Sequence, residues 1–90
     1  MANKLRDAER VLKAVANARR LAIIVYLSKN PGAKVGTIAE VIGLSFKSTS
    51  RHLSVLLSAN IVERKQIGLE MHYHLQTPLN PIIKTSLSIL

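Results

Sequence analysis

The first third of the chain has the apolar spacing of two helices. An apolar residue recurs every three or four positions over residues 4–16, which predicts a helix with one apolar face. That face is formed by Leu5, Ala8, Leu12 and Val15. Asn17 is an N-capping residue type, and it predicts a second helix that ends before the Pro-Gly pair at 31–32. Apolar positions wrap more than half of this second helix, so we expect it at the centre of the core.

Two short helices joined by a glycine are predicted in the middle of the chain. Thr37 and Glu40 fit a capping box, in which the two residues satisfy each other's orphan backbone amides, so a third helix is expected to begin at Thr37. Gly43 can take the left-handed conformation that ends a helix. Ser45 then caps a fourth helix, whose pattern continues to Ala59.

The segments on either side of Gly68 alternate apolar and polar residues. Residues 61–67 and 70–76 therefore predict a β-hairpin that turns at this glycine. The face of the second strand that is predicted to pack on the core carries Met71, Tyr73 and Leu75. Two short helices with a tight turn, followed by a hairpin, predict a mainly α winged helix-turn-helix, formed by residues 1–90 as one domain.

The end of the chain predicts a last helix that is almost uncharged. This helix comes after two prolines, Pro78 and Pro81, and only Glu70 and Lys84 are charged beyond Gln66. An apolar terminal helix on a small basic domain indicates a buried interface, and a domain of 90 residues gains from a second subunit. The predicted interface of a homodimer consists of Leu5, Ala8, Leu12, Leu79, Ile83, Leu87 and Leu90.

Charge and composition narrow the class of partner. Thirteen Lys and Arg against five Asp and Glu give a formal charge of +8, which favours nucleic acid or an anionic membrane surface. The chain has no cysteine, which excludes disulfides, thiolate metal sites and cysteine nucleophiles. Its longest apolar run, residues 21–27, is far shorter than the roughly 20 residues of a membrane-spanning helix. We therefore expect a soluble cytoplasmic protein with no membrane partner.

The fourth helix, residues 45–59, is the predicted recognition helix. At 100° per residue, Thr49, Leu53 and Leu56 point inward. The outward side and its flanks carry Lys47, Ser48, Ser50, Arg51, Ser54 and Ser58. Small hydroxyl side chains let a helix backbone approach the major groove closely, and an arginine can bond guanine O6 and N7 together. Taken alone, the same pattern fits a solvated helix face; the capping box, the glycine turn and the net charge together favour DNA.

Three segments of the chain resemble the arsenic-repressor (ArsR/SmtB-type) family of winged helix-turn-helix regulators. They cover residues 12–24, 37–56 and 58–75, and the most specific pieces are Ala-Asn-x-x-Arg-Leu and Ser-x-Ser-Arg-His-Leu. The resemblance implies a homodimer, paired through the first and last helices, on double-stranded DNA with a palindromic operator. It further implies DNA contacts from Ser45, Lys47, Ser48, Ser50 and Arg51. Phe46 stands where the family often has glutamine, so a contact with a thymine methyl is expected there.

The chain departs from the family in its sensing residues and its wing. The third helix has no cysteine and the last has no His, Asp or Glu, so we expect neither metal nor thiol sensing and no cofactor. The predicted wing tip lacks the arginine common in the family, so wing contacts are expected from Arg64, Lys65 or His72. Phosphate contacts are also expected at the helix N-termini, at Thr37 and Ser45.

Three histidines have two interpretations each. Glu70, His72 and His74 share one strand face and could present zinc ligands; a polar, solvent-facing strand is the favoured alternative, because no fourth ligand is evident. His52 lies at the margin of the core, where a structural hydrogen bond is favoured over a DNA contact. His72 and His74 could instead make DNA binding sensitive to pH.

The sequence thus predicts a dimeric, sequence-specific DNA-binding regulator, with a repressor favoured. Catalysis has little support, because no paired carboxylates or pocket-forming glycine loop accompany the polar residues, and we expect no enzyme. Two alternatives stay open: an architectural protein that coats DNA by charge alone, and a winged-helix module that binds an acidic protein.

Overall fold

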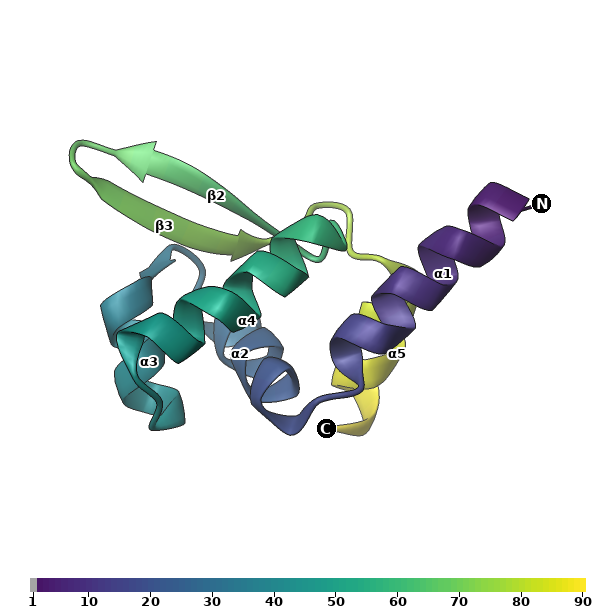
Figure 1. The fold of residues 1–90 in the computed structure, drawn as a ribbon, viewed down its shortest axis with the longest axis horizontal. Coiled ribbons are helices and arrows are strands. Elements are labelled where there is room, and N and C mark those ends of the chain that lie inside the picture. The colour runs from purple at the N-terminus through teal and green to yellow at the C-terminus, as the bar shows by residue number, and fades with distance from the viewer. Residues whose placement is uncertain (1) are drawn as a thin grey trace.

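The computed structural model describes residues 2–90, which form five helices and a small three-stranded sheet (Figure 1). In chain order the elements are α1 (Ala2–Val15), α2 (Ala18–Lys29), β1 (Ala33–Lys34), α3 (Val35–Ile42), α4 (Phe46–Ser58), β2 (Val62–Ile67), β3 (Glu70–Leu75) and α5 (Pro81–Ile89). This mainly helical architecture, with an antiparallel hairpin after the fourth helix, confirms the predicted winged helix-turn-helix.

The second helix, α2, lies at the centre of the core as predicted. The Asn17 side chain accepts a hydrogen bond from the Arg20 amide at 3.0 Å, which fixes where α2 begins. Ile23, Ile24 and Leu27 are fully buried, and α1, α3, α4 and β3 all contact this helix. The core is therefore assembled around α2.

The turn between α3 and α4 is built as the sequence predicts. Gly43 has a φ of +70°, and the amides of Gly43 and Leu44 both donate to the Ala39 carbonyl, which closes α3. The open space around Gly43 leaves room for a Cβ, so the glycine is required by its backbone conformation alone. At the other end of α4, Asn60 takes the left-handed conformation, with a φ of 57°, which asparagine adopts more readily than other non-glycine residues.

The start of α3 differs from the prediction. This helix begins at Val35, two residues before Thr37, and no side-chain hydrogen bond caps it in the described part of the chain. The capping-box prediction is therefore wrong. The cause is a tertiary one: Lys34 is held extended by its pairing with β3, so the chain passes directly from a strand into the helix and Thr37 falls within the first turn.

A third strand joins the hairpin that the sequence predicts. The sheet has the order β1-β3-β2, all antiparallel, so β3 is its central strand. β1 consists of two residues, and Ala33 and Lys34 pair with Tyr73 and His72. The β2-β3 hairpin, hereafter the wing, projects from the helices on one side while α1 projects on the other, so the molecule measures 40 × 26 × 22 Å (Figure 1).

Only the base of the wing packs on the core. Tyr73 is buried and Leu75 is half-buried, as predicted for this strand face, but Met71 is 38% exposed. The prediction for Met71 is wrong because β3 extends beyond the helices that cover its other end.

The last helix, α5, begins later than its apolar pattern suggests. Asn80 caps it by accepting from the Ile82 amide at 2.8 Å, and Pro81 occupies the first turn. Leu79 therefore precedes the helix. Ile83 is only 1% exposed and belongs to the core of its own protomer, so its predicted place in a subunit interface is wrong.

Candidate nucleic-acid interface

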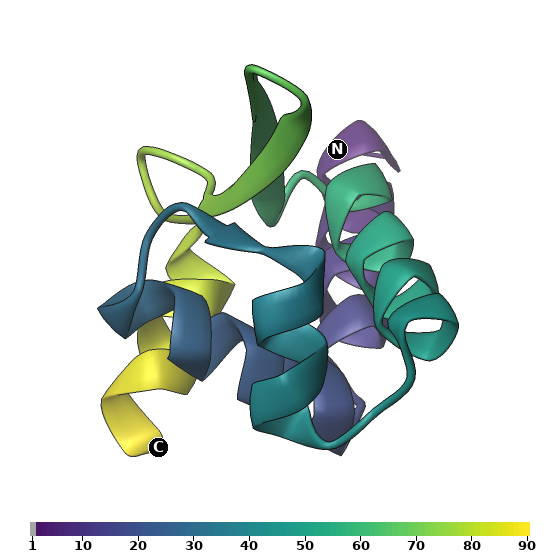
Figure 2. The ribbon, with the colours of Figure 1, turned by 90° about the vertical axis from the view of Figure 1, so that its left-hand side faces the viewer.

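The recognition helix α4 has two contrasting faces. Thr49, Leu53 and Leu56 are fully buried, which confirms the predicted inward face. The opposite side is exposed and carries Lys47, Arg51, Ser54 and Ser58. Ser48 and Ser50 on the flanks are half-buried. The helix contains no carboxylate, and it lies at the edge of the molecule, far from α5 (Figure 2), so its cationic face is open to a polyanion.

The first turn of α4 is held by its own hydroxyl groups. The Ser45 hydroxyl accepts from the Ser48 amide at 3.0 Å, and the Thr49 hydroxyl donates to the Ser45 carbonyl at 2.8 Å. These bonds confirm the predicted cap. Because the Ser45 hydroxyl acts as an acceptor here, its own hydrogen can still be donated to a phosphate. Phe46, in the same turn, is 63% exposed and is presented on the surface rather than to the core.

One arginine connects the recognition helix to α1. The Arg20 side chain donates to the Ala14 carbonyl at 2.6 Å and to the Lys13 carbonyl at 3.4 Å, which satisfies carbonyls at the C-terminal end of α1. The same guanidinium lies 3.3 Å from His52 Nδ1 on α4. Because a guanidinium can only donate, His52 Nδ1 is the acceptor and its proton is on Nε2. The structural hydrogen bond predicted for His52 is thus present.

Protonation of His52 is expected to weaken this connection. Burial, followed by the charges of Arg20 and Arg19, lowers the pKa of His52 from its ordinary value of 6.5. The unfolded chain then binds a proton at a higher pH than the folded chain does, so stability is lost as the pH falls below about 6.5. We expect the free energy of unfolding, measured with denaturant at about pH 7.5 and about pH 5.5, to fall more for the wild type than for His52→Gln. Equal decreases would show that His52 contributes nothing.

The wing strand β2 points its two basic residues, Arg64 and Lys65, to opposite faces of the sheet. Arg64 pairs with Tyr73 and Lys65 pairs with His72, and paired residues of antiparallel strands lie on the same face. Arg64 and Lys65 are both exposed. Arg64 therefore shares the face whose base packs on the core, and Lys65 shares the other, so one flat surface cannot meet both.

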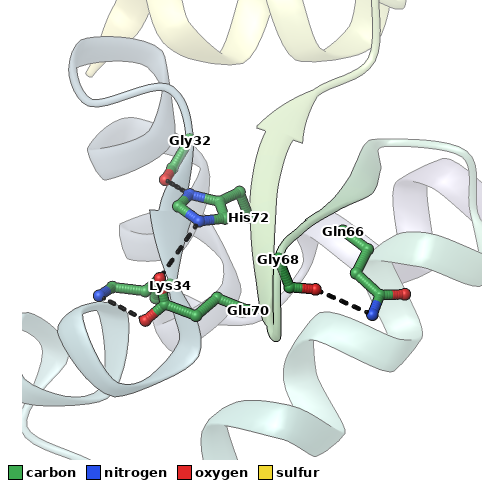
Figure 3. A network of polar contacts seen from close by, with 6 residues as sticks. All are labelled: Gly32, Lys34, Gln66, Gly68, Glu70 and His72. Carbon is green, nitrogen blue, oxygen red and sulfur yellow. Dashed lines mark hydrogen bonds and ion pairs between the residues drawn. The ribbon is translucent and has the colours of Figure 1, made fainter.

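A polar network joins the wing to the chain before α3 (Figure 3). His72 Nδ1 donates to the Gly32 carbonyl at 2.7 Å, and its Nε2 lies 3.9 Å from the Glu70 carboxylate. Lys34 forms an ion pair with Glu70 at 2.8 Å. The hydrogen bond and the charge of Lys34 lower the pKa of the Glu70 carboxyl. His72 is thus half-buried and bonded within the protomer, which leaves less of it for the predicted DNA contact.

The zinc interpretation of this strand finds no support in the geometry. Among residues 2–90, no group of three His, Asp or Glu residues lies close enough together to hold a metal ion. Glu70 is paired with Lys34, and His74 is half-buried beside Gly32. The alternative of a solvent-facing strand is also only partly right, because the chain around β1 covers His72 and His74.

Residues 17–64 match the sequence profile of the family described as bacterial regulatory protein, arsR family. This segment runs from the cap of α2 to the middle of β2, and so includes the whole helix-turn-helix. The chain belongs to the arsR family.

Curated relatives of this arsR-family protein extend the match beyond the helix-turn-helix. It is 30% identical over 80 residues to the HTH-type transcriptional regulator YgaV of Escherichia coli (strain K12), an alignment that covers 88% of this chain and 81% of YgaV. It is also 30% identical over 86 residues to the transcriptional repressor PagR of Bacillus anthracis, covering 87% of this chain and 86% of PagR. The chain is therefore a winged helix-turn-helix transcriptional regulator.

Solved structures of arsR-family and related regulators have the same fold. The solution structure of a homodimeric winged helix-turn-helix DNA-binding domain from Mycobacterium bovis, Mb0332, matches with a TM-score of 0.86 at 28% identity, covering 98% of this chain and 79% of that one. The crystal structure of PagR matches with a TM-score of 0.83 at 26% identity, covering 99% and 98%. No helix within residues 2–90 is both long enough and apolar enough to span a bilayer.

The arsR-family chain also has an exposed apolar stripe on α1. Its core contacts come from Val11 and Ala14, which the sequence pattern had not placed on the buried face. Leu5 and Leu12, which are predicted to pair with a second subunit, are 65% and 53% exposed in the protomer. Leu90, at the end of α5, is exposed as well. These large apolar side chains are available to a second subunit, whereas Leu87 is half-buried.

Two functional features of this arsR-family chain escaped sequence reasoning. The Arg20–His52 bond spans 32 positions, and only the Asn17 cap hinted that Arg20 lies at a helix start. No sequence pattern predicts that Lys34 forms a strand and neutralises a wing carboxylate. No periodicity signals a two-residue strand.

Proposed function

We propose that this arsR-family protein is a homodimeric repressor that binds a palindromic DNA operator in a sequence-specific way. The observation that carries the proposal is the outward face of α4. This face is exposed and carries two cations, Lys47 and Arg51, and no carboxylate, while the inward face of the same helix is fully buried and so holds it rigidly. A helix of this kind fits the major groove of B-DNA.

Within the groove, Arg51 and the serines read the bases. Arg51 projects from the middle of the exposed face, where a bidentate contact with guanine is possible. The small side chains of Ser50 and Ser54 allow close approach and can donate to base edges. Phe46, exposed at the start of α4, contacts a thymine methyl. These contacts supply the sequence preference of the protein.

Phosphate contacts hold the register of α4 in the groove. Lys47 supplies one at the start of α4, and the free amides in the first turn of α3, which begins at Val35 and includes Thr37, and in the first turn of α4 after Ser45 supply others. On the wing, Arg64 is favoured over Lys65 and His72 as the phosphate contact. His72 is bonded to the Gly32 carbonyl, and Lys65 lies on the same face of the sheet as His72.

Dimerisation through α1 and α5 places two copies of α4 on one face of the DNA. The exposed leucines of α1 and the exposed end of α5 support this arrangement, and the similar Mb0332 domain is homodimeric. Two-fold symmetry requires a palindromic site with half-sites roughly 34 Å apart. The dimer represses transcription by occupying DNA that RNA polymerase needs. The similar PagR is a transcriptional repressor, which supports repression over activation. The protein acts by binding, not catalysis, and acts where the DNA is, in the cytoplasm.

Selection of binding sites from random double-stranded DNA tests this function. At about 150 mM salt we expect enrichment of one inverted repeat with half-sites about one helical turn apart. A protein that coats DNA by charge alone would enrich no motif, because its binding weakens steeply with salt. The absence of any binding at low salt would instead favour a module that binds an acidic protein.

A further inference from the structure

A groove of about 400 Å³ separates α1 from the second half of the recognition helix. From α4 it is lined by Ser54, Val55 and Ser58, and Ser54 and Ser58 belong to the DNA-facing side of that helix. Arg10 and Lys13 line the opposite wall, on α1. The groove is therefore continuous with the surface that reads DNA, although α1 itself enters no major groove.

The charge in this groove is of one sign. Arg10, Lys13 and Arg20 contribute to its lining, and no carboxylate does so among the described residues. A larger groove on the other side of α4, between α3 and the wing, is lined by Glu40 and Glu70 but only one cation. A polyanion is therefore attracted more strongly to the α1 side of the recognition helix than to the wing side.

Two of the three cations are free to bind a ligand. Arg20 is committed to the carbonyls of α1 and to His52. Arg10 forms no ion pair within residues 2–90, and Lys13 pairs only with Glu9, at 3.3 Å on the exposed surface, which water screens. On the helical wheel Arg10 lies about 160° from Leu12 and Lys13 about 100° from it. Pairing of α1 through its leucines thus leaves both cations uncovered.

We propose that the α1–α4 groove is a second DNA-binding site, which seats the sugar–phosphate backbone on the side of the recognition helix nearer the dimer axis. A helix in the major groove has a backbone strand on each side, and this groove receives one of them. Arg10 and Lys13 bind phosphates there, and the hydroxyl of Ser58 donates to a phosphate oxygen. The inference rests on the proposed DNA-binding function and adds the dimerisation helix to the DNA contacts.

Salt titrations of binding to the selected operator and to a random duplex test the groove. Each phosphate contact contributes about 0.9 to the slope of log affinity against log salt. Because a dimer carries each residue twice, Arg10→Gln and Lys13→Gln are each expected to lower the magnitude of the slope by about 2. The affinity loss, roughly several-fold at about 150 mM salt, is expected to be equal on the two duplexes, since phosphates carry no sequence information.

Lys29→Gln is the matched control. Lys29 is an exposed lysine at the end of α2 distant from α4, and its loss removes the same charge without touching the groove (Figure 2). Arg10→Lys keeps the charge and should keep the slope. Sedimentation of each variant verifies that the dimer is intact. A slope for Arg10→Gln and Lys13→Gln equal to that of Lys29→Gln overturns the inference and leaves the proposed function standing. A wild type that binds neither duplex at low salt overturns both.

Discussion

Replacing Leu12 by glutamate is expected to split the dimer and to abolish operator binding at concentrations that saturate the wild type. Leu12 is 53% exposed in the protomer, and pairing of α1 across a two-fold axis would bury it twice. A carboxylate there would be desolvated without a partner in both subunits. A single protomer holds one half-site only, so the loss of linked binding lowers operator affinity by about 100-fold or more.

Analytical ultracentrifugation together with operator titration measures this effect. Leu69→Glu is the matched control, because Leu69 is fully exposed at the tip of the wing, away from α1, and should leave the dimer intact. If Leu12→Glu sediments as a dimer, α1 is not the subunit interface. The variant is expected to unfold cooperatively, since Leu12 does not belong to the core of the protomer, but at a lower temperature than the wild type because dimerisation no longer stabilises it.

The second large effect is expected from Arg51→Ala. Loss of a bidentate arginine–guanine contact costs about 1–3 kcal/mol in each half-site, and the cost falls on the operator and not on random DNA. The sequence preference of the protein should flatten at the base pair that Arg51 reads. Arg51 is exposed and makes no hydrogen bond within residues 2–90, so the fold should be unaffected.

Lys47→Ala is the comparison variant that distinguishes a base contact from a phosphate contact. Lys47 is exposed on the same helix, but as a phosphate contact its removal should weaken operator and random DNA alike. Binding curves for both variants on both duplexes separate the two roles. If Arg51→Ala loses as much affinity for random DNA as for the operator, then Arg51 also contacts phosphate and the bases are read elsewhere.

The helix-turn-helix could be predicted because its determinants are local. Gly43, Ser45 and Asn60 act on the backbone within one turn of themselves, and the buried face of α4 follows from a fixed angle per residue. The capping box at Thr37 failed for the opposite reason. There the long-range pairing of β1 with β3 holds Lys34 extended, so α3 begins at Val35 and the local signal at Thr37 does not set the start of the helix.

For the candidate site too, features within one helix could be predicted from the sequence, whereas contacts between elements could not. The exposed cations of α4 could be read from the helical wheel, and so could the apolar stripe of α1. What a wheel cannot give is which of two apolar faces packs inward: Val11 and Ala14 do so, and Leu5 and Leu12 remain outside. Nor could spacing reveal that Arg20 bonds His52 or that Arg64 and Lys65 diverge, because each depends on how separate elements dock.

In the proposed dimer, Arg20 between α1 and α4 is expected to fix the distance between the two recognition helices. In a dimer joined through α1, the distance between the two recognition helices depends on how far α4 stands from α1 in each subunit. Arg20 is the side chain that bonds both helices, from the Ala14 carbonyl to His52. The proposed match between the protein and the helical repeat of DNA would therefore depend on Arg20, which lies outside the recognition helix and forms its hydrogen bonds within its own subunit.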